Sequence, residues 1–523
     1  IGKKELLFMK DGKIKLKKEV FWPTIIFTGG AAILGIVNNE ALTSITKKFF
    51  TWSLDSFGWL YQIIVMISFL VMMALFFSKL GSVRIGGKDA KAKHSFGAWF
   101  AMALTGGVAS GIVTWGVNEP LIYYGNVWGE LDTLGIEPFS AKAAIFAMGR
   151  SFFNWTFLPY AVYTLCGVVI AYLYFNKKRK LSVTTTLEPI LGEKINSSKF
   201  SAIIDILSML AIVLGLTSGL TACIVLIVSG VSYSYGISSS VALFYGVGIL
   251  IICLFTFSTY IGLDKGLKVI GSLNAYFYYG LLIFLFLIGP TLFILRNGTA
   301  GMAEWLHNFW NWGLDPIDIG GAALTRSWTL FDWAVWIAYA PVMGIFLAKI
   351  SYGRTIREFI IVNMILPSIF GIVWFSTFGN SALNMQMSGT FDLVNVIKNT
   401  NAVTAVWAFL KNLPFGIGTI IIPINILIII ASFATAADAT SMTVASMCVK
   451  DLEVGEDAPG YLKAIWGIVI GSIAIIMSAF GGGEQGVDGV KSLATAGGFF
   501  VLFIFILQVC SVIKLFFIDK IEE

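Results

Sequence analysis

The stretch "WTLFDWAVWIAY" (328–339) places aromatic side chains and one acid at the start of a long apolar segment. It holds Trp328, Trp333, Trp336 and Tyr339, with Asp332 among them. Lipid-facing helices are built mainly from aliphatic residues and keep their aromatic residues near the interfaces. A carboxylate within a bilayer is expected to face protein or a water-filled path. The stretch therefore predicts a membrane helix with one functional face, directed at protein or a water-filled path instead of lipid.

Helical spacing separates these side chains. Intervals of four, three and four residues place one narrow stripe along the helix, made of Asp332, Trp336, Tyr339 and Met343. Trp333 lies beside this stripe. We expect Trp328 and Phe331 to be structural.

The whole chain has the composition of a membrane protein. Of its 523 residues, 57% are hydrophobic and 13% are charged, and the mean hydropathy is +0.83. A soluble protein would have about 25% charged residues. The charges cluster between apolar runs of roughly the 20 residues that cross a bilayer. These features predict an all-α polytopic membrane protein.

The apolar runs predict twelve spans, and we see no cleavable signal peptide. Their approximate limits are 21–38, 59–78, 96–123, 144–175, 202–231, 241–262, 273–295, 329–350, 359–379, 415–447, 464–481 and 494–517. With the N-terminus in the cytoplasm, about three quarters of the 36 Lys and Arg residues fall inside. Both termini are therefore expected in the cytoplasm. The segment 303–312 is too short to span and predicts an amphipathic helix in the outer interface.

Span three contains "TGGVASGIVTWGVNEP" (105–120), where small residues replace bulky ones. One interpretation is close helix packing. The other is an unwound segment whose free backbone groups at Gly107, Val108 and Ala109 contact a substrate carboxylate or an ion. Glu119 is expected near the outer end of the span, as an interfacial or packing carboxylate.

Span four contains "NWTFLPYAVY" (154–163). At 100° per residue, Trp155, Tyr160 and Tyr163 fall within an arc of about 140° and could share a face. Pro159 lies between them and is expected to loosen the helix. An aromatic interface belt is the alternative, although these residues lie well inside the span.

Span ten contains "ASFATAADATSMT" (431–443), which is rich in hydroxyl groups. Interhelical hydrogen bonds explain such residues without a ligand. The alternative is part of a cation site, because hydroxyl and carbonyl oxygens suit sodium. Thr435 is the candidate residue.

A trimethylammonium group is the ligand chemistry that an aromatic cluster suits. It has a full positive charge and no N–H, so hydrogen bonds cannot hold it. Each aromatic ring contributes about 0.5–2 kcal/mol of cation–π attraction. A substrate carboxylate would need donors, which the free amides of a broken helix supply.

These residues resemble the betaine/choline/carnitine transporter family. The string "WTLFDWAVWIAYAPVMGIFLAKISYGRTIREF" (328–359) looks like the family signature, with Tyr352 where Arg is usual. Three other strings match in order, "WGVNEPLIYY" (115–124), "IDILSMLA" (204–211) and "TAADATS" (435–441).

The resemblance implies a fold and an assembly. The fold has twelve helices with two inverted five-helix repeats, as in sodium-coupled amino-acid transporters, and family members are typically trimers. The expected parts are a cytoplasmic segment (1–20), two extra helices (21–95), the first repeat (96–295), an outer amphipathic connector (296–328), the second repeat (329–517) and a short cytoplasmic end (518–523).

The resemblance also implies binding residues. The family's cage falls on Trp155, Tyr160, Tyr163 and Trp336, and Tyr339 fills a position that is Trp or Tyr in the family. Met343 falls where sodium-independent carnitine/γ-butyrobetaine exchangers have a Met whose sulfur replaces an ion. Trp333 is kept as a flanking candidate.

Departures from the family pattern concern ion coupling. The span-five threonines of one sodium site fall on Ile212 and Leu216, which cannot bind sodium. The adjacent Thr and Ser of the other site fall on Thr435 and Ala436, so one hydroxyl is lost. The exchangers' Arg in span seven looks like Asn274 here. We interpret one sodium site as lost and the other as weakened.

The expected function is secondary transport of quaternary ammonium compounds across the cell membrane, by exchange or proton coupling with little or no sodium dependence. The alternative is a sodium-coupled glycine betaine symporter with one residual site. A channel or turgor sensor is disfavoured because only "KLFFIDKIEE" follows the last span. A membrane enzyme has no support, since we find no catalytic carboxylate pair, histidine cluster or nucleotide loop.

No cofactor, metal or nucleic acid is expected. The five cysteines lie in or beside apolar runs without paired spacing, and His94 and His307 are the only histidines. The expected partners are a quaternary ammonium substrate, the lipid bilayer and two further copies of the chain.

Asp332 replaces an aromatic residue of the family pattern, and Val335 replaces a Trp. The carboxylate is either hydrated at the outer mouth, an attractor for a cation such as choline, or a proton-coupling group. If either of the last two holds, Asp332→Asn should lower uptake or change its pH profile between about pH 5.5 and 8. Uptake that is unchanged across this range would leave only the hydrated carboxylate.

Overall fold

Every named element in the described part of the chain is helical. The computed structural model describes residues 16–107, 109–197, 199–261, 264–317, 319–450, 458–480 and 484–519. An all-helical protein with one continuous apolar interior agrees with the predicted fold class.

Eight helical segments in these residues are long and apolar enough to cross a membrane. They comprise α2 (Lys18–Val37), α3 (Asn39–Phe77), α6 with α7 (Ala141–Trp155, Phe157–Ala171), α9 (Lys199–Tyr235), α13 (Phe331–Ile350), α14 with α15 (Ile356–Ile360, Leu366–Met387), α19 (Gly460–Phe480) and α20 (Glu484–Ile513). A bent pair, α11 (Asp264–Ile288) and α12 (Thr291–Gly313), makes a ninth if it counts as one span.

The other three predicted spans fall on helices outside this set. Span three is divided into α4 (Phe96–Gly107) and α5 (Ala109–Gly125), and spans six and ten correspond to α10 (Val241–Ile261) and α18 (Gly418–Met447). Two short helices that the sequence did not predict, α16 (Leu393–Asn399) and α17 (Ala402–Lys411), precede α18. Twelve crossings therefore remain a prediction.

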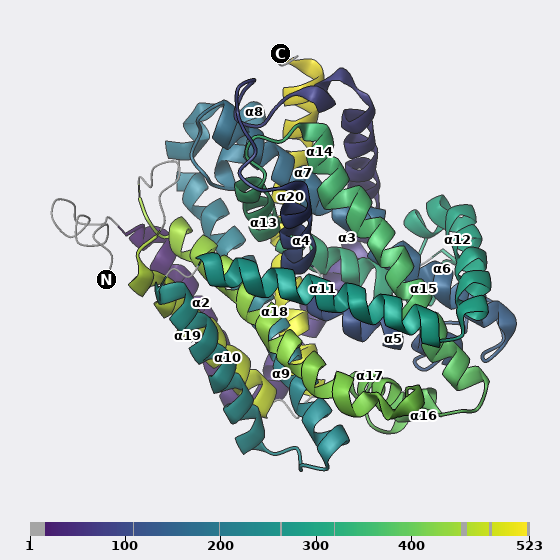
Figure 1. Ribbon diagram of the computed structural model, residues 1–523. Coiled ribbons are helices and arrows are strands. Elements are labelled where there is room, and N and C mark those ends of the chain that lie inside the picture. The colour runs from purple at the N-terminus through teal and green to yellow at the C-terminus, as the bar shows by residue number, and fades with distance from the viewer. Residues whose placement is uncertain are drawn as a thin grey trace.

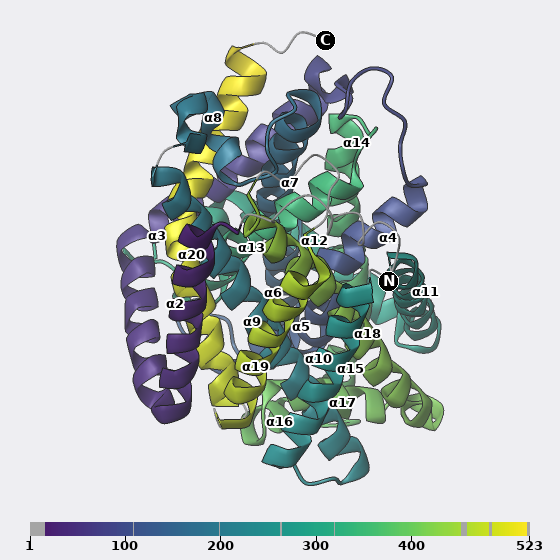
Figure 2. The same cartoon turned by 90° about the vertical axis from the view of Figure 1, so that its left-hand side faces the viewer.

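Helix α13, which contains the opening stretch, lies in the interior. It packs against α7, α20 and α9. Figures 1 and 2 show α7 and α13 surrounded by other helices, with α2, α10 and α19 grouped at one edge. Large apolar side chains are exposed on the peripheral helices, as Ile26 on α2 and Phe257 on α10 are. This distribution fits a protein whose outer surface contacts lipid.

The chain turns sharply between α11 and α12, by 108°. Pro290 has no N–H and cannot continue α11, and a Cβ on Gly289 would lie 2.4 Å from the Leu285 carbonyl oxygen. The predicted limits need correction here, because span seven ends at Ile288 and the connecting helix begins at Thr291, well before residue 303.

The basic loop of the signature ties helices together on one side of the molecule. Arg357 donates to the carbonyl oxygens of Phe76 and Ser78 at the end of α3, while the Arg354 guanidinium lies 4.8 Å from the Trp99 ring of α4. Thr355 and Glu358 form a capping box that starts α14. These contacts give the loop a structural role.

Helix α12 packs closely on α6 through glycine. A Cβ on Gly301 would lie 2.6 Å from the Met148 Cβ, so the two helices would have to separate. We expect Gly301→Ala to cost about 1–3 kcal/mol of stability. The thermal midpoint Tm of the purified protein should therefore fall by several degrees. The matched control is Gly280→Ala in α11, where a Cβ would meet nothing within 4 Å. Equal Tm values for the two variants would contradict this account.

Candidate functional site

Trp336 lies among three other aromatic side chains, and we call Trp155, Tyr160, Tyr163 and Trp336 the Trp336 cluster. The Trp336 ring centroid lies 4.6 Å from that of Tyr163, 5.4 Å from that of Tyr160 and 6.3 Å from that of Trp155. The pairs with Trp155 and Tyr160 are T-shaped. In a T-shaped pair the edge of one ring lies against the face of the other. The aromatic residues predicted in span four thus meet the one predicted in span eight.

A helix break shapes this cluster. Helix α6 ends at Trp155 and α7 begins at Phe157, because Thr156 has φ −121° and ψ −147°. Pro159 has no N–H to offer the Trp155 carbonyl four residues earlier. The predicted loosening near Pro159 is therefore a break three residues before it. Trp155 on one side of this break and the two tyrosines on the other all contact Trp336, where the prediction assumed one continuous helix.

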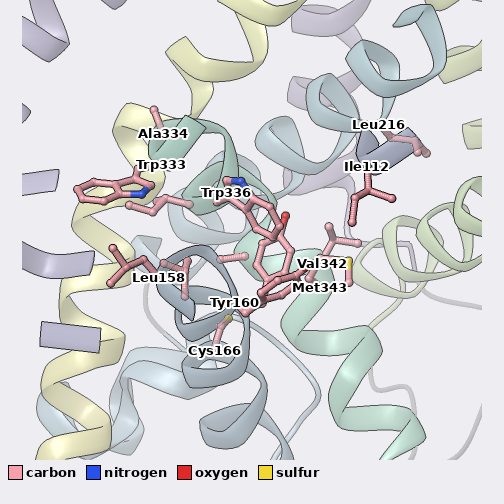
Figure 3. Close-up of a cluster of buried hydrophobic side chains, with 14 of the residues drawn as sticks. Ile112, Leu158, Tyr160, Cys166, Leu216, Trp333, Ala334, Trp336, Val342 and Met343 are labelled. Carbon is pink, nitrogen blue, oxygen red and sulfur yellow. The ribbon is translucent and has the colours of Figure 1, made fainter. Parts of the chain in front are cut away.

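The stripe predicted on α13 does not act as one face. Figure 3 shows Tyr160 beside Trp336, while Trp333 lies apart from them. The Trp333 ring is fully buried and packs 6.0 Å from that of Phe153. The Tyr339 hydroxyl donates to the carbonyl of Gly215 on α9. Trp333 and Tyr339 thus have packing partners outside the cluster.

The Tyr160 hydroxyl is a free polar group at the cluster. Its oxygen is buried and has no hydrogen-bond partner among the residues that the structure describes. A buried hydroxyl without a partner is costly, and ligand oxygen atoms can satisfy it. The cluster thus offers aromatic faces together with one donor.

Several predicted contacts lie outside the described residues. Val108 is one of them, and the side chains of Gly107, Ala109 and Thr435 also lie outside the description. Ile212 and Leu216, where the resemblance places one sodium site, are buried apolar side chains on α9. Asn274 on α11 donates to the Ser432 hydroxyl of α18 at 2.7 Å, which joins these two helices.

A buried polar network adjoins the cluster, and sequence analysis missed it. Glu119 on α5 is 1% exposed and accepts hydrogen bonds from Trp155 Nε1 at 2.5 Å, Asn154 Nδ2 at 2.9 Å and the Tyr123 hydroxyl at 3.0 Å. Of the two alternatives expected for Glu119, this burial excludes the interfacial carboxylate and agrees with the packing one. An acid inside an apolar span was the available signal.

Arg150 on α6 lies at the other end of this network. Its Nη2 donates to the hydroxyls of Thr329, at 2.6 Å, and Thr325, at 3.2 Å. Thr329 in turn donates to Asn154 Oδ1 at 3.1 Å. Both threonines belong to η5 (Thr325–Leu330), a π-helical turn before α13. Such turns are frequent at functional sites.

A cavity of about 470 Å³ opens beside Arg150. Its lining includes Phe146, Trp312 and Asp315, and the guanidinium lies 5.0 Å from the Trp312 ring. The carboxylate of Asp315 accepts from the backbone N–H groups of Ile317 and Ala322. The cavity is therefore polar on one wall and aromatic on another.

Asp332 is half-buried in the first turn of α13. It lies within electrostatic range of Arg150 and Tyr123. The carboxylate thus belongs to the charged surroundings of the polar network. Its part in transport stays a prediction.

Metal chemistry has no visible centre in the described ranges. No group of three or more His, Cys, Asp or Glu side chains there could hold a metal ion. The Trp336 cluster instead combines aromatic rings with a buried hydroxyl inside a membrane protein. This combination suits a soft organic cation held by dispersion and cation–π attraction.

Comparison with known proteins identifies the family. The model of the BCCT (betaine/carnitine/choline) family of transporters matches residues 19–520. Glycine betaine transporter OpuD of Bacillus subtilis is 30% identical over 474 residues, which cover 90% of this chain and 89% of the relative. Glycine betaine transporter 1 of Vibrio parahaemolyticus is 32% identical over 432 residues (82% and 80%), and the ectoine/hydroxyectoine transporter of Virgibacillus pantothenticus is 29% identical over 475 residues (90% and 92%). The chain belongs to the betaine/carnitine/choline transporter family and is a multi-pass membrane transporter.

Proposed function

We propose that this transporter moves quaternary ammonium compounds by alternating access and holds the cationic head in the Trp336 cluster. The observation that carries the proposal is the approach of three aromatic rings from α6 and α7 to Trp336 on α13. These rings come from two separate parts of the chain, so a relative movement of α13 and α7 opens or closes the cluster. Such a movement is what alternating access requires.

Little or no sodium dependence is the second part of the proposal. The resemblance places one sodium site at Ile212 and Leu216, and both side chains are apolar. The carbonyl of Gly215, which lies between these two residues in the sequence, already accepts a hydrogen bond from the Tyr339 hydroxyl. Met343 lies two turns after Trp336 on α13 and is buried, and its sulfur is the proposed substitute for an ion. Exchange or proton coupling then drives transport. The second candidate is a sodium-coupled glycine betaine symporter that uses Thr435.

The proposed architecture follows the family resemblance. Two inverted five-helix repeats cover residues 96–295 and 329–517, the termini face the cytoplasm, and three copies assemble. Hydroxyl and amide groups suited to a substrate carboxylate are the Tyr160 hydroxyl and the backbone of Gly107, Val108 and Ala109. Asp332 is proposed either to attract the cation or to couple a proton.

The cluster predicts which tryptophan on α13 matters for binding. Trp336→Ala should weaken binding of radiolabelled glycine betaine, carnitine, γ-butyrobetaine or choline by about 10- to 30-fold, since a dry ring contributes about 2 kcal/mol. Trp333→Phe, on the same helix, should leave the affinity within about twofold because its ring packs on Phe153. Equal effects of the two variants, both folded by their Tm, would remove the cluster from the proposal.

Ion coupling can be tested directly in proteoliposomes. Uptake of the same four compounds should proceed without a sodium gradient, because one sodium position has only apolar side chains. Dependence on preloaded substrate would establish exchange, and stimulation by an inward proton gradient would establish proton coupling. Strict dependence on sodium would contradict the proposal and favour the symporter.

A further inference from the structure

The carboxylate of Glu119 holds one edge of a ring in the Trp336 cluster. Its Oε2 accepts from Trp155 Nε1, while its Oε1 accepts from both Asn154 and Tyr123. The contact to Trp155 joins the indole N–H to a carboxylate oxygen, and a hydrogen bond to an ionised acceptor is stronger than one between neutral groups. The carboxylate therefore fixes an aromatic side chain that would otherwise rotate about its own bonds.

The chemistry of the contacts specifies a carboxylate at this position. Three donors converge on two oxygens, and only an ionised carboxylate offers acceptors alone. A Gln amide would place its NH₂ group against one of the donors. An Asp would be too short by one methylene to reach all three. The hydroxyl of Tyr123 also accepts from Asn154 at 3.0 Å, so the donors are themselves held in place.

Two neutral side chains connect Glu119 to Arg150, whose positive charge compensates the carboxylate. Asn154 contacts Glu119 through its amide N–H and accepts from Thr329, and Thr329 accepts from Arg150. Arg150 is fully buried and lies within electrostatic range of Glu119. An acid and a base inside a membrane protein are tolerated when they compensate each other.

Trp155 is half-buried, and its ring has neighbours on several sides. The far edge of its six-membered ring lies against Gly111, where a Cβ would be 3.4 Å away. Its ring lies 5.8 Å from that of Phe375 and perpendicular to Trp336. Helix α5 thus holds both edges of the indole, at Gly111 and at Glu119.

We propose that Glu119 is a positioning residue that sets the orientation of Trp155 and raises the affinity of the Trp336 cluster for a quaternary ammonium head. A negative charge at the N–H edge makes the indole face more negative, which strengthens its attraction for a cation. This inference rests on the proposed function. It assigns Glu119 a role that does not require contact with the substrate.

The chain contains a matched control for this interaction. Glu130, in the loop after α5, accepts from Trp328 Nε1 at 3.3 Å and is also buried. Trp328 lies outside the Trp336 cluster and stacks on Trp128. Glu130→Gln therefore makes the same chemical change to an indole–carboxylate pair outside the Trp336 cluster, one that, within the described residues, touches the Glu119 network only through the packing of Trp328 on Tyr123.

The test measures equilibrium binding to purified protein. The probe is whichever of radiolabelled glycine betaine, carnitine, γ-butyrobetaine and choline binds the wild type most tightly. Glu119→Gln should weaken binding by about 10-fold, as expected for a hydrogen bond to a charged group. Glu130→Gln should stay within about twofold. Trp155→Phe keeps an aromatic ring but removes the N–H, and it should weaken binding by a similar factor. This variant tests the same hydrogen bond if Glu119→Gln does not fold.

Two further readouts separate positioning from general stability. In the Trp155→Phe background, Glu119→Gln should weaken binding by less than about a further twofold, because both substitutions act on the same Glu119–Trp155 hydrogen bond. Competition by the carbon isostere of the probe, with tert-butyl in place of trimethylammonium, should change less than competition by the probe itself. Independent losses in the double variant, or wild-type affinity in Trp155→Phe, would overturn the inference. Wild-type affinity in Trp336→Ala would instead overturn the proposed function, and wild-type protein that binds none of the four compounds would overturn both.

Discussion

The contact between Trp336 and the aromatic residues of α6 and α7 is the interaction on which the functional site depends. It requires α13 to lie directly on α7, which the buried interface between these helices provides. It also requires the chain to leave the helical path at Thr156, so that Trp155 before the break and both tyrosines after it contact Trp336. A trimethylammonium head can be held by rings alone, so this small arrangement is sufficient for its chemistry. The polar network then determines how firmly the rings are held.

Polar and charged groups inside the membrane are arranged around this cluster at increasing distance. Glu119 contacts the indole N–H of Trp155, Asn154 and Thr329 form the next links, and Arg150 ends the chain beside the cavity at Trp312. The π-helical turn η5 contributes two of the hydroxyls that hold Arg150. The cavity and the cluster are thus connected by hydrogen bonds, and a change at one end has a physical route to the other.

The all-helical class and the interior position of the opening stretch could be predicted from apolar run length and from the aromatic stripe on α13. The meeting of Trp155 with Trp336 was expected from the family resemblance alone, because periodicity grouped Trp155 only with Tyr160 and Tyr163 and assumed an unbroken helix. Trp333 and Tyr339 show the limit of spacing arguments. Both lie on or beside the stripe, yet Trp333 packs on Phe153 of α6 and Tyr339 donates to the Gly215 carbonyl of α9. Glu119 was missed because its donors come from two different helices, and periodicity within one helix cannot show such convergence.

The location of a bound quaternary ammonium compound is the central claim, and a cryo-electron microscopy map of the protein with such a compound tests it most directly. The account predicts density for the cationic head among Trp155, Tyr160, Tyr163 and Trp336, with the Trp155 indole N–H still directed at Glu119. Density confined to the cavity beside Arg150 and Trp312, with the Trp336 cluster empty, would contradict it.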